Sequence, residues 1–447
     1  MSDAKQDFLS TVAALPKFGT GVCLERINAS LQQLDLVDYI ANCRKIAVTG
    51  TNGKGSTAHM LNSIVHEFGF KVGLFSSPHF VDFNDRFKVS KTNVDYSALN
   101  IARQSVMNVV SAVSTELDEQ FGVFEVLFLI ALKTFQAQQC DFLIFEAGIG
   151  GRYDPVRMLN AEHTVLTSVD LEHCDILGNS KDVIAFDKLD ACYHGGTVAL
   201  GNLSSELKRK ITAYASSRAI RCLDNELVTE ATPASNASVK QLALRLPCGN
   251  AIVTVTTPIV DFFAQANMKT ALTLCEALFA GPEFGFSTEQ RVAVYTSALS
   301  TYENPGRLSY LSRSPDIIVD SAHTNDAFEM LFKALRQELG EQKPIFLVGI
   351  SAGREQATLV QQLTEFAAEC IVTCASFKGA EPQLLHNALI NNGVVSTVAN
   401  NIASGLAMAI ERAEQEQRSV VICGGLFFAA EATAILQQRS TQALFLY

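Results

Sequence analysis

A glycine-rich segment at positions 49–57 is the feature of this sequence that most constrains its fold. The segment reads Thr49-Gly-Thr-Asn-Gly-Lys-Gly-Ser-Thr57. It follows a short apolar run, Lys45–Val48, and overlaps the start of Ser56–Phe68, where apolar residues recur at helical spacing. A strand, a glycine-rich turn and a helix in this order form the setting of a phosphate-binding loop, because glycines let backbone N–H groups approach phosphates and a helix N-terminus favours negative charge.

Lys54 is the charged residue of this loop and would neutralise the outer phosphates of a bound nucleotide. The spacing departs from the common phosphate loop, because only Thr51 and Asn52 separate Gly50 from Gly53. In addition, Gly55 stands between Lys54 and Ser56. The alternative is a glycine-rich turn whose lysine faces solvent.

Short apolar runs alternate with amphipathic stretches along most of the chain. This alternation implies mostly parallel sheets covered by helices on both faces, so we expect an α/β fold. Up to about residue 302 the expected strands are 45–48, 71–75, 141–145 and 164–168. A second series, expected to form a smaller Rossmann-like unit, has strands at 317–320, 345–349, 370–374 and 419–423 and helices at 325–339, 355–369, 380–391 and 402–417.

The length of 447 residues exceeds that of one ordinary core and favours two domains. We place their boundary near residue 302, which gives domains of residues 1–302 and 303–447. Val239–Leu246 and Ala251–Thr257 alternate apolar and polar residues on either side of Cys248-Gly-Asn250. This pattern predicts an antiparallel hairpin appended to the main sheet.

Composition excludes several classes of protein. The formal net charge of −11 argues against a general binder of nucleic acid or membrane surfaces, although a local basic pocket could still hold an anion. No apolar run approaches the roughly 20 residues that a membrane span needs. The first residues, Met1–Asp7, are polar and contain no apolar core of the kind found in signal sequences, so we expect none. The 11 cysteines include no CxxC pair, so we expect buried free thiols in a reducing cytoplasm, with a zinc site as the alternative.

In three further segments, residues suited to ligand binding lie at the end of an expected strand. Phe75-Ser-Ser-Pro-His-Phe80 lies where ligands bind in open parallel sheets, unless it is a surface turn. Glu146 ends an apolar strand before a glycine-rich turn and is well placed to hold magnesium, with a charged strand cap as the alternative. His173 follows the next strand and could ligate a cation, orient a phosphate or lie hydrogen-bonded in the core.

Other candidate residues are less specific by themselves. Lys188 lies on a largely apolar helical stretch, where a lysine commonly snorkels to the surface. Arg307, in Asn304-Pro-Gly-Arg307, lies at the expected domain junction and either reaches a nucleotide or belongs to a linker. Asp320 and His323, in Asp320-Ser-Ala-His323, end a strand of the second series.

Taken together, these motifs resemble the folylpolyglutamate synthase / dihydrofolate synthase family of the Mur-ligase superfamily. The match is in order and covers nearly the whole chain. It includes Phe18-Gly, Leu24-Glu-Arg-Ile27, the glycine-rich loop, Ser-Ser-Pro-His, Glu-x-Gly-x-Gly-Gly-Arg, Asp-x-x-His, Asn267, Asn-Pro-Gly-Arg, Asp-x-Ala-His and Val421-Ile-Cys-Gly-Gly-Leu-Phe427. The Ser-Pro-His and Pro-Gly-Arg motifs favour the folate branch over other Mur-like ligases.

The resemblance implies a Mur-ligase-like ATPase domain with a pterin pocket, followed by a glutamate-ligase domain. ATP would phosphorylate the carboxylate of dihydropteroate or a folate, and the amine of L-glutamate would attack the acyl phosphate to give an amide, ADP and phosphate. Lys54 and Mg²⁺ would stabilise charge on the transferring phosphoryl group. The expected partners are these small molecules, with no nucleic acid and no membrane, and we expect a cytoplasmic monomer.

Residue roles follow by matching positions in this sequence. Lys188 matches a lysine that is carbamylated in the family, and His323 falls near the incoming glutamate. Mg²⁺ would be held by Ser77, Glu146 and His173. The acceptor would be bound by Phe124, Glu125, Tyr153 and Asp154. The implied ATP contacts are Thr51, Asn52, Gly53, Lys54, Gly55, Ser56, Asn267, Arg307 and Asp320.

Four short segments depart from the family pattern. Asp154-Pro-Val-Arg157 replaces Asp-Ala-Thr-Asn, and Lys188-Leu-Asp-Ala191 replaces Lys-Ala-Gly-Ile. Asp320-Ser-Ala-His-Thr-Asn325 replaces Asp-Gly-Ala-His-Asn-Pro, and Gly424-Gly425 replaces Gly-Ser. Because the altered segments lie near the acceptor and glutamate positions, a diverged paralogue that glutamylates another pterin or aryl acid is the alternative. An NTPase switch and a non-catalytic folate-binding relative are the competing classes.

Overall fold

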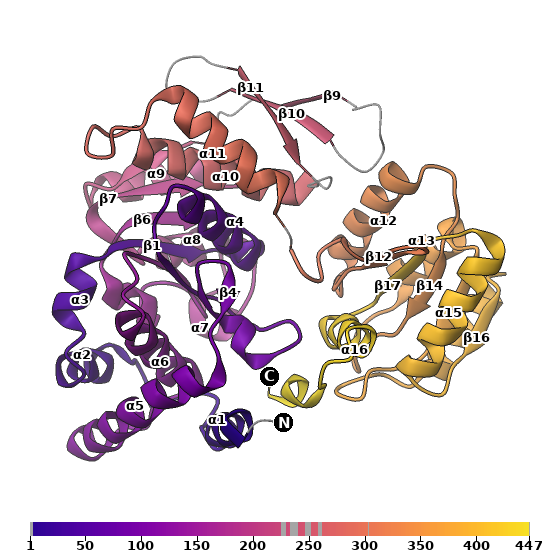
Figure 1. Ribbon diagram of the computed structural model, residues 1–447, viewed down its shortest axis with the longest axis horizontal. Coiled ribbons are helices and arrows are strands. Elements are labelled where there is room, and N and C mark those ends of the chain that lie inside the picture. The colour runs from indigo at the N-terminus through magenta and orange to yellow at the C-terminus, as the bar shows by residue number, and fades with distance from the viewer. Residues whose placement is uncertain are drawn as a thin grey trace. The chain divides into compact units, whose positions relative to one another are not determined.

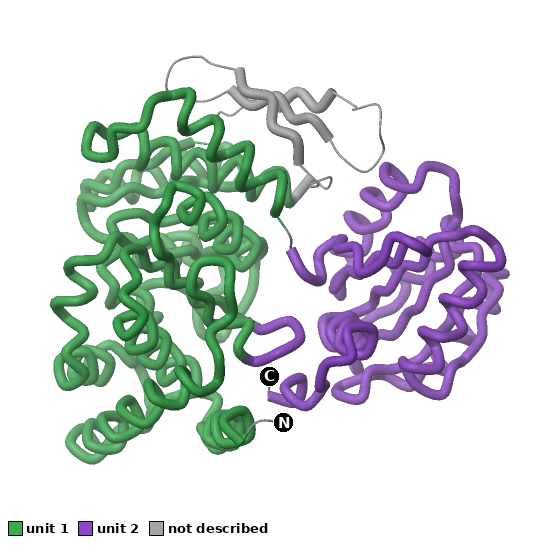
Figure 2. Tube along the Cα trace, viewed as in Figure 1, with its two compact units in different colours: residues 1–78, 84–259, 263–302 green, residues 79–83, 260–262, 303–447 purple. Residues whose placement is uncertain are grey.

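The computed structural model describes residues 3–224, 229–232, 240–245, 252–257, 262–302 and 304–446 (Figure 1). The chain divides into two compact units (Figure 2). Unit 1 comprises Met1–Pro78, Asn84–Ile259 and Phe263–Tyr302. Unit 2 comprises His79–Phe83, Val260–Phe262 and Glu303–Tyr447, so a five-residue piece from the first part of the chain belongs to the second unit.

Unit 1 is built on an eight-stranded sheet. Its strand order is β4-β3-β2-β5-β1-β6-β7-β8, and every neighbouring pair from β2 to β8 is parallel. At the other end of the sheet, β3 pairs antiparallel with β2, and the edge strand β4 pairs antiparallel with β3. The strands are β1 (Arg44–Thr49), β2 (Val72–Phe75), β3 (Phe87–Val89), β4 (Thr92–Asn93), β5 (Phe142–Glu146), β6 (Ala161–Leu166), β7 (Cys192–Leu200) and β8 (Arg221–Leu223).

Helices cover both faces of this sheet. The helices are α1 (Asp3–Ala13), α2 (Leu24–Gln33), α3 (Val37–Asn42), α4 (Lys54–Glu67), α5 (Tyr96–Leu117), α6 (Val123–Ala137), α7 (Cys174–Leu177), α8 (Lys181–Leu189), α9 (Ser205–Ser216), α10 (Phe262–Phe279) and α11 (Thr288–Ser300), with short 3₁₀ turns at Phe83–Arg86 and Pro155–Leu159. Side chains alternate along each strand, so Ile46 and Val48 of β1 pack against α4, α10 and α11. On the other face Phe145 of β5 packs edge-on against Phe128 and Phe135 of α6.

The predicted hairpin forms, but it belongs to a different sheet from the one expected. β10 (Lys240–Arg245) pairs antiparallel with β11 (Ile252–Thr257) and, on its other side, with β9 (Thr229–Thr232). These strands make a separate three-stranded sheet, so the prediction that the hairpin extends the main sheet was wrong. The Cys248-Gly-Asn250 connection lies outside the described residues.

Unit 2 is a second α/β sandwich, as predicted. Its sheet order is β12-β13-β17-β14-β15-β16, with only the β12–β13 pair antiparallel. The strands are β12 (Ser309–Arg313), β13 (Asp316–Val319), β14 (Ile345–Val348), β15 (Glu369–Val372), β16 (Ser396–Val398) and β17 (Val420–Cys423). The helices are α12 (Asn325–Leu339), α13 (Ala357–Phe366), α14 (Pro382–Asn391), α15 (Ile402–Glu416) and α16 (Leu426–Leu436), followed by a 3₁₀ turn at Gln442–Phe445. Helices α12, α13 and α14 cover one face of the sheet, and α15 and α16 cover the other.

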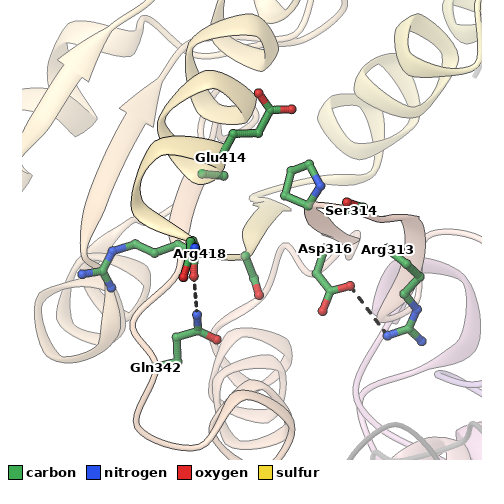
Figure 3. A pocket seen from close by; sticks show the side chains of 10 residues that line it. Arg313, Ser314, Asp316, Gln342, Glu414 and Arg418 are labelled. Atoms are coloured by element: carbon green, nitrogen blue, oxygen red, sulfur yellow. Dashed lines mark hydrogen bonds and ion pairs between the residues drawn. The ribbon is translucent and has the colours of Figure 1, made fainter.

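The amino ends of three strands of unit 2 surround an open, polar hollow of about 410 Å³ (Figure 3). Arg313 and Asp316 line it where β13 begins, Gln342 lies before β14, and Arg418 lies before β17. Ligands of open parallel sheets bind at the carboxyl ends of the strands. This hollow is at the opposite edge, so it is not the candidate site.

Two further sequence expectations concern membranes and cysteines. In the described part of the chain no helix has both the length and the apolar character needed to cross a bilayer. The ten described cysteines are free thiols, seven of them buried, which agrees with the predicted absence of disulfides.

Candidate active site

The glycine-rich loop joins β1 to α4 in the central part of the unit 1 sheet. Gly50 and Gly53 have φ values of 138° and 85°, which glycine adopts far more readily than other residues. Gly53 also faces Asn267 of α10, since a Cβ on Gly53 would lie 2.5 Å from the Asn267 side-chain oxygen. The structure therefore brings Asn267 to the loop, as the resemblance implied, although 214 positions separate the two residues.

The segment that follows β6 holds this loop in shape. The Thr167 hydroxyl donates to the Asn52 carbonyl at 2.7 Å, and the Ser168 hydroxyl accepts the Asn52 N–H at 2.9 Å. The Thr51 hydroxyl accepts the backbone N–H of Asp170 at 3.0 Å. These short side chains fix the loop before a ligand arrives, which reduces the cost of ordering it on binding.

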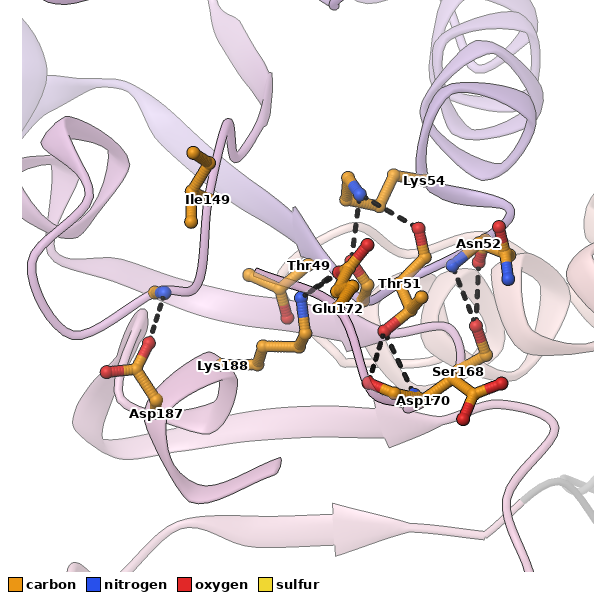
Figure 4. Close-up of polar contacts among 12 residues, drawn as sticks. Thr49, Thr51, Asn52, Lys54, Ile149, Ser168, Asp170, Glu172, Asp187 and Lys188 are labelled. Carbon is orange, nitrogen blue, oxygen red and sulfur yellow. Dashed lines mark hydrogen bonds and ion pairs between the residues drawn. The ribbon is translucent and has the colours of Figure 1, made fainter. Parts of the chain in front are cut away.

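Two lysines meet at one carbonyl of the loop (Figure 4). The Lys54 Nζ donates to the Gly50 carbonyl at 2.8 Å and to the Thr51 carbonyl at 3.1 Å. The Lys188 Nζ, from the last turn of α8, donates to the same Gly50 carbonyl at 3.0 Å. It also pairs with the Glu172 carboxylate at 2.7 Å. Lys188 is thus a buried part of the loop and does not snorkel to the surface.

Burial and neighbouring charges change the pKa values of Lys188 and Glu172 in this cluster. Burial lowers the pKa of Lys188 from its usual value, and the nearby Lys54 charge lowers it further, although Glu172 acts in the opposite direction. Burial also opposes ionisation of Glu172, but the hydrogen bond from Lys188 and the charge of Lys54 prevail and hold the pKa of Glu172 below its usual value. Glu172 is therefore a carboxylate at neutral pH.

The last turn of α8 also supports the second glycine-rich turn. Asp187 accepts the N–H of Gly151 at 2.9 Å, while its neighbour Lys188 reaches Gly50. A Cβ on Gly150 would lie 2.3 Å from the Asp187 carboxylate, which explains a glycine there. One helix end therefore positions both glycine-rich loops through two consecutive side chains.

Of the three predicted magnesium ligands, the structure joins two directly. The Ser77 N–H donates to the buried Glu146 carboxylate at 2.9 Å. The same carboxylate faces the first turn of α4, since a Cβ on Gly55 would lie 3.4 Å from it. His173 is exposed and has a left-handed backbone conformation immediately before α7.

The described residues contain no cluster of three or more His, Cys, Asp or Glu side chains that could hold a metal by themselves. Mg²⁺ does not need such a cluster, because it commonly keeps several waters and binds one or two carboxylates together with substrate phosphates. A buried carboxylate at the start of the phosphate loop helix fits that mode of binding.

The predicted acceptor residues have structural partners of their own. The Asp154 carboxylate accepts the N–H groups of Gly148, Ile149 and Val156 at 2.9 to 3.0 Å. Burial raises its pKa to about 6, against the opposing effect of these three hydrogen bonds. Asp154 therefore shapes the turn that follows β5, and a ligand could use only the lone pair that remains.

Glu125 is likewise engaged. Both of its oxygens accept hydrogen bonds from the fully buried Arg26, at 2.7 and 2.8 Å. Arg26 also binds Glu119 and the carbonyl of Thr20, so Arg26 connects α2 and the segment before it to the start of α6. Next in the chain, the Phe124 ring lies over Gly148, where a Cβ would be 3.1 Å from the ring. Tyr153 is exposed, and its carbonyl accepts a bond from the Cys23 thiol.

In unit 2 the predicted residues gather where β13 ends. The Asp320 carboxylate accepts the N–H of Leu308 at 2.9 Å and that of Ala322 at 2.7 Å. The His323 Nδ1 lies 3.0 Å from the Ser321 carbonyl. Burial and the positive charges of Arg307 and Arg354 lower the pKa of His323, so its imidazole is neutral at pH 7. Unit 2 therefore presents two exposed arginines beside a neutral histidine.

Sequence reasoning missed four residues that shape these sites: Arg26, Glu172, Asp187 and Arg354. Glu172 stood next to a candidate ligand and Asp187 next to a candidate lysine, so adjacency was an available signal. Arg26 stood in the Leu24-Glu-Arg-Ile27 motif but was given no role, and Arg354 offered no signal. Their partners lie 99 and 31 positions away, and only the fold brings them together.

Comparison with known proteins agrees with this geometry. The Mur ligase middle domain model matches residues 48–274, and the Mur ligase glutamate ligase domain model matches residues 306–426. The folylpolyglutamate synthase of Lacticaseibacillus casei is 28% identical over 393 residues, covering 87% of this chain and 88% of that protein. The dihydrofolate synthase/folylpolyglutamate synthase of Bacillus subtilis is 24% identical over 445 residues, covering 96% and 99%.

Solved structures show the same fold. A folylpolyglutamate synthase from Thermotoga maritima has a TM-score of 0.84 at 20% identity and covers 99% of both chains. A Mycobacterium tuberculosis folylpolyglutamate synthase complexed with ADP and AMPPCP has a TM-score of 0.82 at 19% identity, covering 98% of this chain and 99% of that one. With a family model over half of its residues, a phosphate loop of the expected geometry and a second α/β unit, the chain belongs to the Mur ligase family of ATP-dependent, ADP-forming ligases, in the branch that holds the folylpolyglutamate and dihydrofolate synthases.

Proposed function

We propose that this protein joins L-glutamate to dihydropteroate, to a folate or to both, through an acyl-phosphate intermediate. The observation that carries the proposal is the pre-formed phosphate loop with Lys54 and Lys188 on one carbonyl, in a chain that also matches a glutamate ligase domain. The named relatives, which include dihydrofolate and folylpolyglutamate synthases, support the choice of acceptor.

The reaction has two steps. The acceptor carboxylate attacks the γ-phosphorus of ATP, which forms an acyl phosphate and releases ADP. The amine of glutamate then attacks the acyl carbon, which forms the amide, loses a proton and releases phosphate. Charge develops on the transferring phosphoryl group in the first step, so a pre-placed ammonium group such as Lys54 lowers the barrier.

The remaining nucleotide contacts follow from position on the loop. The N–H groups of Thr51, Asn52, Gly53, Gly55 and Ser56 belong to the loop or to the first turn of α4, where backbone donors favour phosphate. Asn267 lies against Gly53 and would limit how the nucleotide enters. In unit 2 we propose Arg307 and Asp320 as further nucleotide contacts.

Mg²⁺ is proposed as the metal, held by Glu146 and Ser77 with His173 as the third ligand. When bound, it would neutralise phosphate charge during transfer. Without it, Glu146 itself faces the first turn of α4 and would repel a triphosphate, so a cation between them is electrostatically favoured.

The two substrates would bind apart. For the acceptor we propose Phe124 as an apolar surface for a flat ring, with Glu125, Tyr153 and Asp154 in the wall around it. For glutamate we propose His323, because the charges of Arg307 and Arg354 near it would attract the carboxylates of an acidic amino acid, while the neutral imidazole adds no charge that would repel its ammonium group. Carbamylation of Lys188 stays a prediction, since its amine is engaged by Glu172 and Gly50.

An acceptor other than a folate is the second candidate. Arg157, where the family has a small polar residue, donates to the Arg152 carbonyl at 2.9 Å, and Pro155 begins a 3₁₀ turn beside Asp154. The pocket wall therefore differs from the family pattern. This difference favours testing other pterin and aryl acids alongside the folates.

The test is a substrate panel. The purified protein is incubated with ATP, Mg²⁺ and glutamate and with dihydropteroate, tetrahydrofolate or simple aryl acids, and products are identified by mass spectrometry while ADP release is followed. Glutamylated dihydropteroate or folate supports the proposal. Glutamylation of another acid alone would leave only the ligase chemistry, and release of ADP without acid or amine would point to an NTPase.

A further inference from the structure

Arg152, at the end of the second glycine-rich turn, is held by both its side chain and its backbone. Its Nε donates to the carboxylate of Asp190, the residue after α8, at 2.7 Å. Its Nη2 donates to the hydroxyl of Tyr214, on α9, at 3.1 Å. Its carbonyl accepts a hydrogen bond from the Arg157 guanidinium at 2.9 Å. The ligase reaction proposed above gives these contacts no role.

The Asp190 carboxylate is the centre of this network. Its side chain is 9% exposed, and its other oxygen pairs with the Arg218 Nε at 3.0 Å. The Tyr214 hydroxyl donates to the same carboxylate at 3.0 Å and accepts hydrogen bonds from Arg152 and Arg218. The Tyr214 ring also stacks on Phe186 of α8, with ring centroids 4.3 Å apart. One carboxylate with charge-assisted hydrogen bonds therefore fixes the Arg152 side chain to α8 and α9.

The contacts at Arg152 close the turn that carries two of the proposed acceptor residues. Tyr153 and Asp154 lie between Arg152, which the network holds, and Arg157, which bonds back to the Arg152 carbonyl. Asp154 in turn accepts backbone N–H groups on both sides of it along the chain. A displacement of Arg152 would therefore move both proposed acceptor residues.

Both partners of Arg152 come from segments that depart from the family pattern. Asp190 stands where that pattern has glycine, and Arg157 stands where it has asparagine. Glycine has no side chain that could hold Arg152, and asparagine lacks the long guanidinium side chain that reaches its carbonyl. The two departures lie more than 30 positions apart in the sequence, yet they act on one residue.

We propose that Asp190 and Arg157 are positioning residues that act through Arg152 to set the wall of the acceptor site. They fix where Tyr153 and Asp154 stand, and they thereby select among acceptor acids by the shape that fits this wall. The inference rests on the proposed function insofar as these two wall residues meet the acceptor.

Removing the charge of Asp190 gives a distinctive kinetic result. Asp190→Asn keeps the size of the side chain but no longer holds the arginines. The Arg152 side chain is 33% exposed, so water can solvate its guanidinium and the protein should still fold. The KM for the acceptor should rise about tenfold, because small displacements of binding groups are costly. The KM for ATP should stay unchanged, since the segment after β6 holds the phosphate loop.

The experiment compares the wild type with Asp190→Asn, Arg157→Asn, the double variant and Asp182→Asn. Asp182 is the matched control, since it lies on α8 but pairs with Lys210, whose side chain is 35% exposed. Steady-state kinetics with dihydropteroate and with tetrahydrofolate give the KM for each acceptor and for ATP. Thermal melting reports on the fold, and hydrogen exchange followed by mass spectrometry reports on the backbone N–H groups of residues 148–157.

We expect faster exchange in residues 148–157, a higher acceptor KM and a changed preference between the two acceptors in Asp190→Asn and Arg157→Asn. The double variant should be little worse than the more affected single variant, because both changes act on Arg152. Asp182→Asn should match the wild type in every measurement.

Two outcomes would overturn the proposal. Unchanged exchange in residues 148–157 would show that Asp190 and Arg157 do not hold the turn. Faster exchange with an unchanged acceptor KM, or with an equal rise in the KM for ATP, would show that the network only maintains the fold. Exchange needs no substrate, so it still tests the hold of Asp190 and Arg157 on the turn if no folate is glutamylated and the proposed function fails.

Discussion

The phosphate loop and the acceptor segment of unit 1 use their charged residues differently. At the loop, Lys54 and Lys188 both donate to the Gly50 carbonyl, and Lys188 also pairs with Glu172. In the acceptor segment, Glu125 is bound to Arg26, and Asp154 is bound to three backbone N–H groups. The loop therefore holds charges that could meet an anionic ligand, whereas Glu125 and Asp154 of the proposed acceptor segment are engaged by partners within the protein.

The comparison shows that charged residues in neighbouring motifs can have two different roles. One group can meet a ligand, and another group stabilises the fold. A charged group whose partner is mobile or easily replaced can exchange that partner for a ligand at little cost in free energy. A charged group whose partners are buried backbone or a buried arginine cannot, because leaving those partners unpaired costs about 1–3 kcal/mol for each group. Mutations in the two regions should therefore affect different measurements.

The largest effect is expected at the buried ion pair. Arg26→Met should lower the free energy of unfolding by about 3–5 kcal/mol, because it leaves the Glu125 carboxylate buried and unpaired. Denaturant unfolding measures this change. Lys181→Met is the control, since the Lys181–Asp170 pair is half exposed and should be worth about 0–1 kcal/mol. If both variants lost the same free energy of unfolding, the buried Arg26–Glu125 pair would be no more important for stability than an exposed pair.

The next effect is on rate and not on stability. Lys54→Met should lower kcat at least about 100-fold, about 2.7 kcal/mol in the barrier, as is typical when a charge that stabilises the transition state is lost. Its unfolding curve should stay close to that of the wild type, because Lys54 bonds only to carbonyls of its own loop. Near-normal turnover by the folded variant would contradict the assignment of the loop.

The structural role of Asp154 should appear in the pH dependence of the free energy of unfolding. The pKa of Asp154 is about 6 in the folded protein, against about 4 for a free carboxyl group, so the folded state holds the proton more tightly. The free energy of unfolding should then fall by about 1.4 kcal/mol per pH unit as pH rises from about 4 to about 6. Asp154→Asn should lack this slope, and denaturant curves across that range compare the two proteins. Parallel pH profiles would show that Asp154 is not the titrating group.

The smallest effect is expected at Glu146, the proposed metal ligand. Glu146→Gln keeps an oxygen for the Ser77 N–H but removes the charge, so the Mg²⁺ concentration for half-maximal rate should rise about tenfold. A titration of ligase rate against Mg²⁺ measures it. Identical Mg²⁺ curves in the variant and the wild type would place the metal elsewhere and would leave Glu146 a structural group like Asp154.

Local pattern was enough to predict much of the fold. The strand at 45–48, the loop and the helix after it were readable because each depends on residues within about 20 positions. The same holds for the parallel sheet of unit 2, whose predicted strands coincide with β13, β14, β15 and β17. The short strands β3, β4, β8, β12 and β16 were missed, since segments of two to five residues carry little periodicity. The nine-residue strand β7 was also missed, because its first half is mostly exposed and contains two glycines.

The sequence by itself determined the class of fold, the phosphate loop and the identity of its lysine, because strand, turn and helix signals are local and glycine is needed where φ is positive. Only the tertiary structure decided which charges work together. Lys188 is 138 positions from Gly50, and Arg26 is 99 positions from Glu125. The role of a charged residue depends on its partner. In an α/β fold, where helices connect the parallel strands, partners come from helices and loops that are distant in the chain.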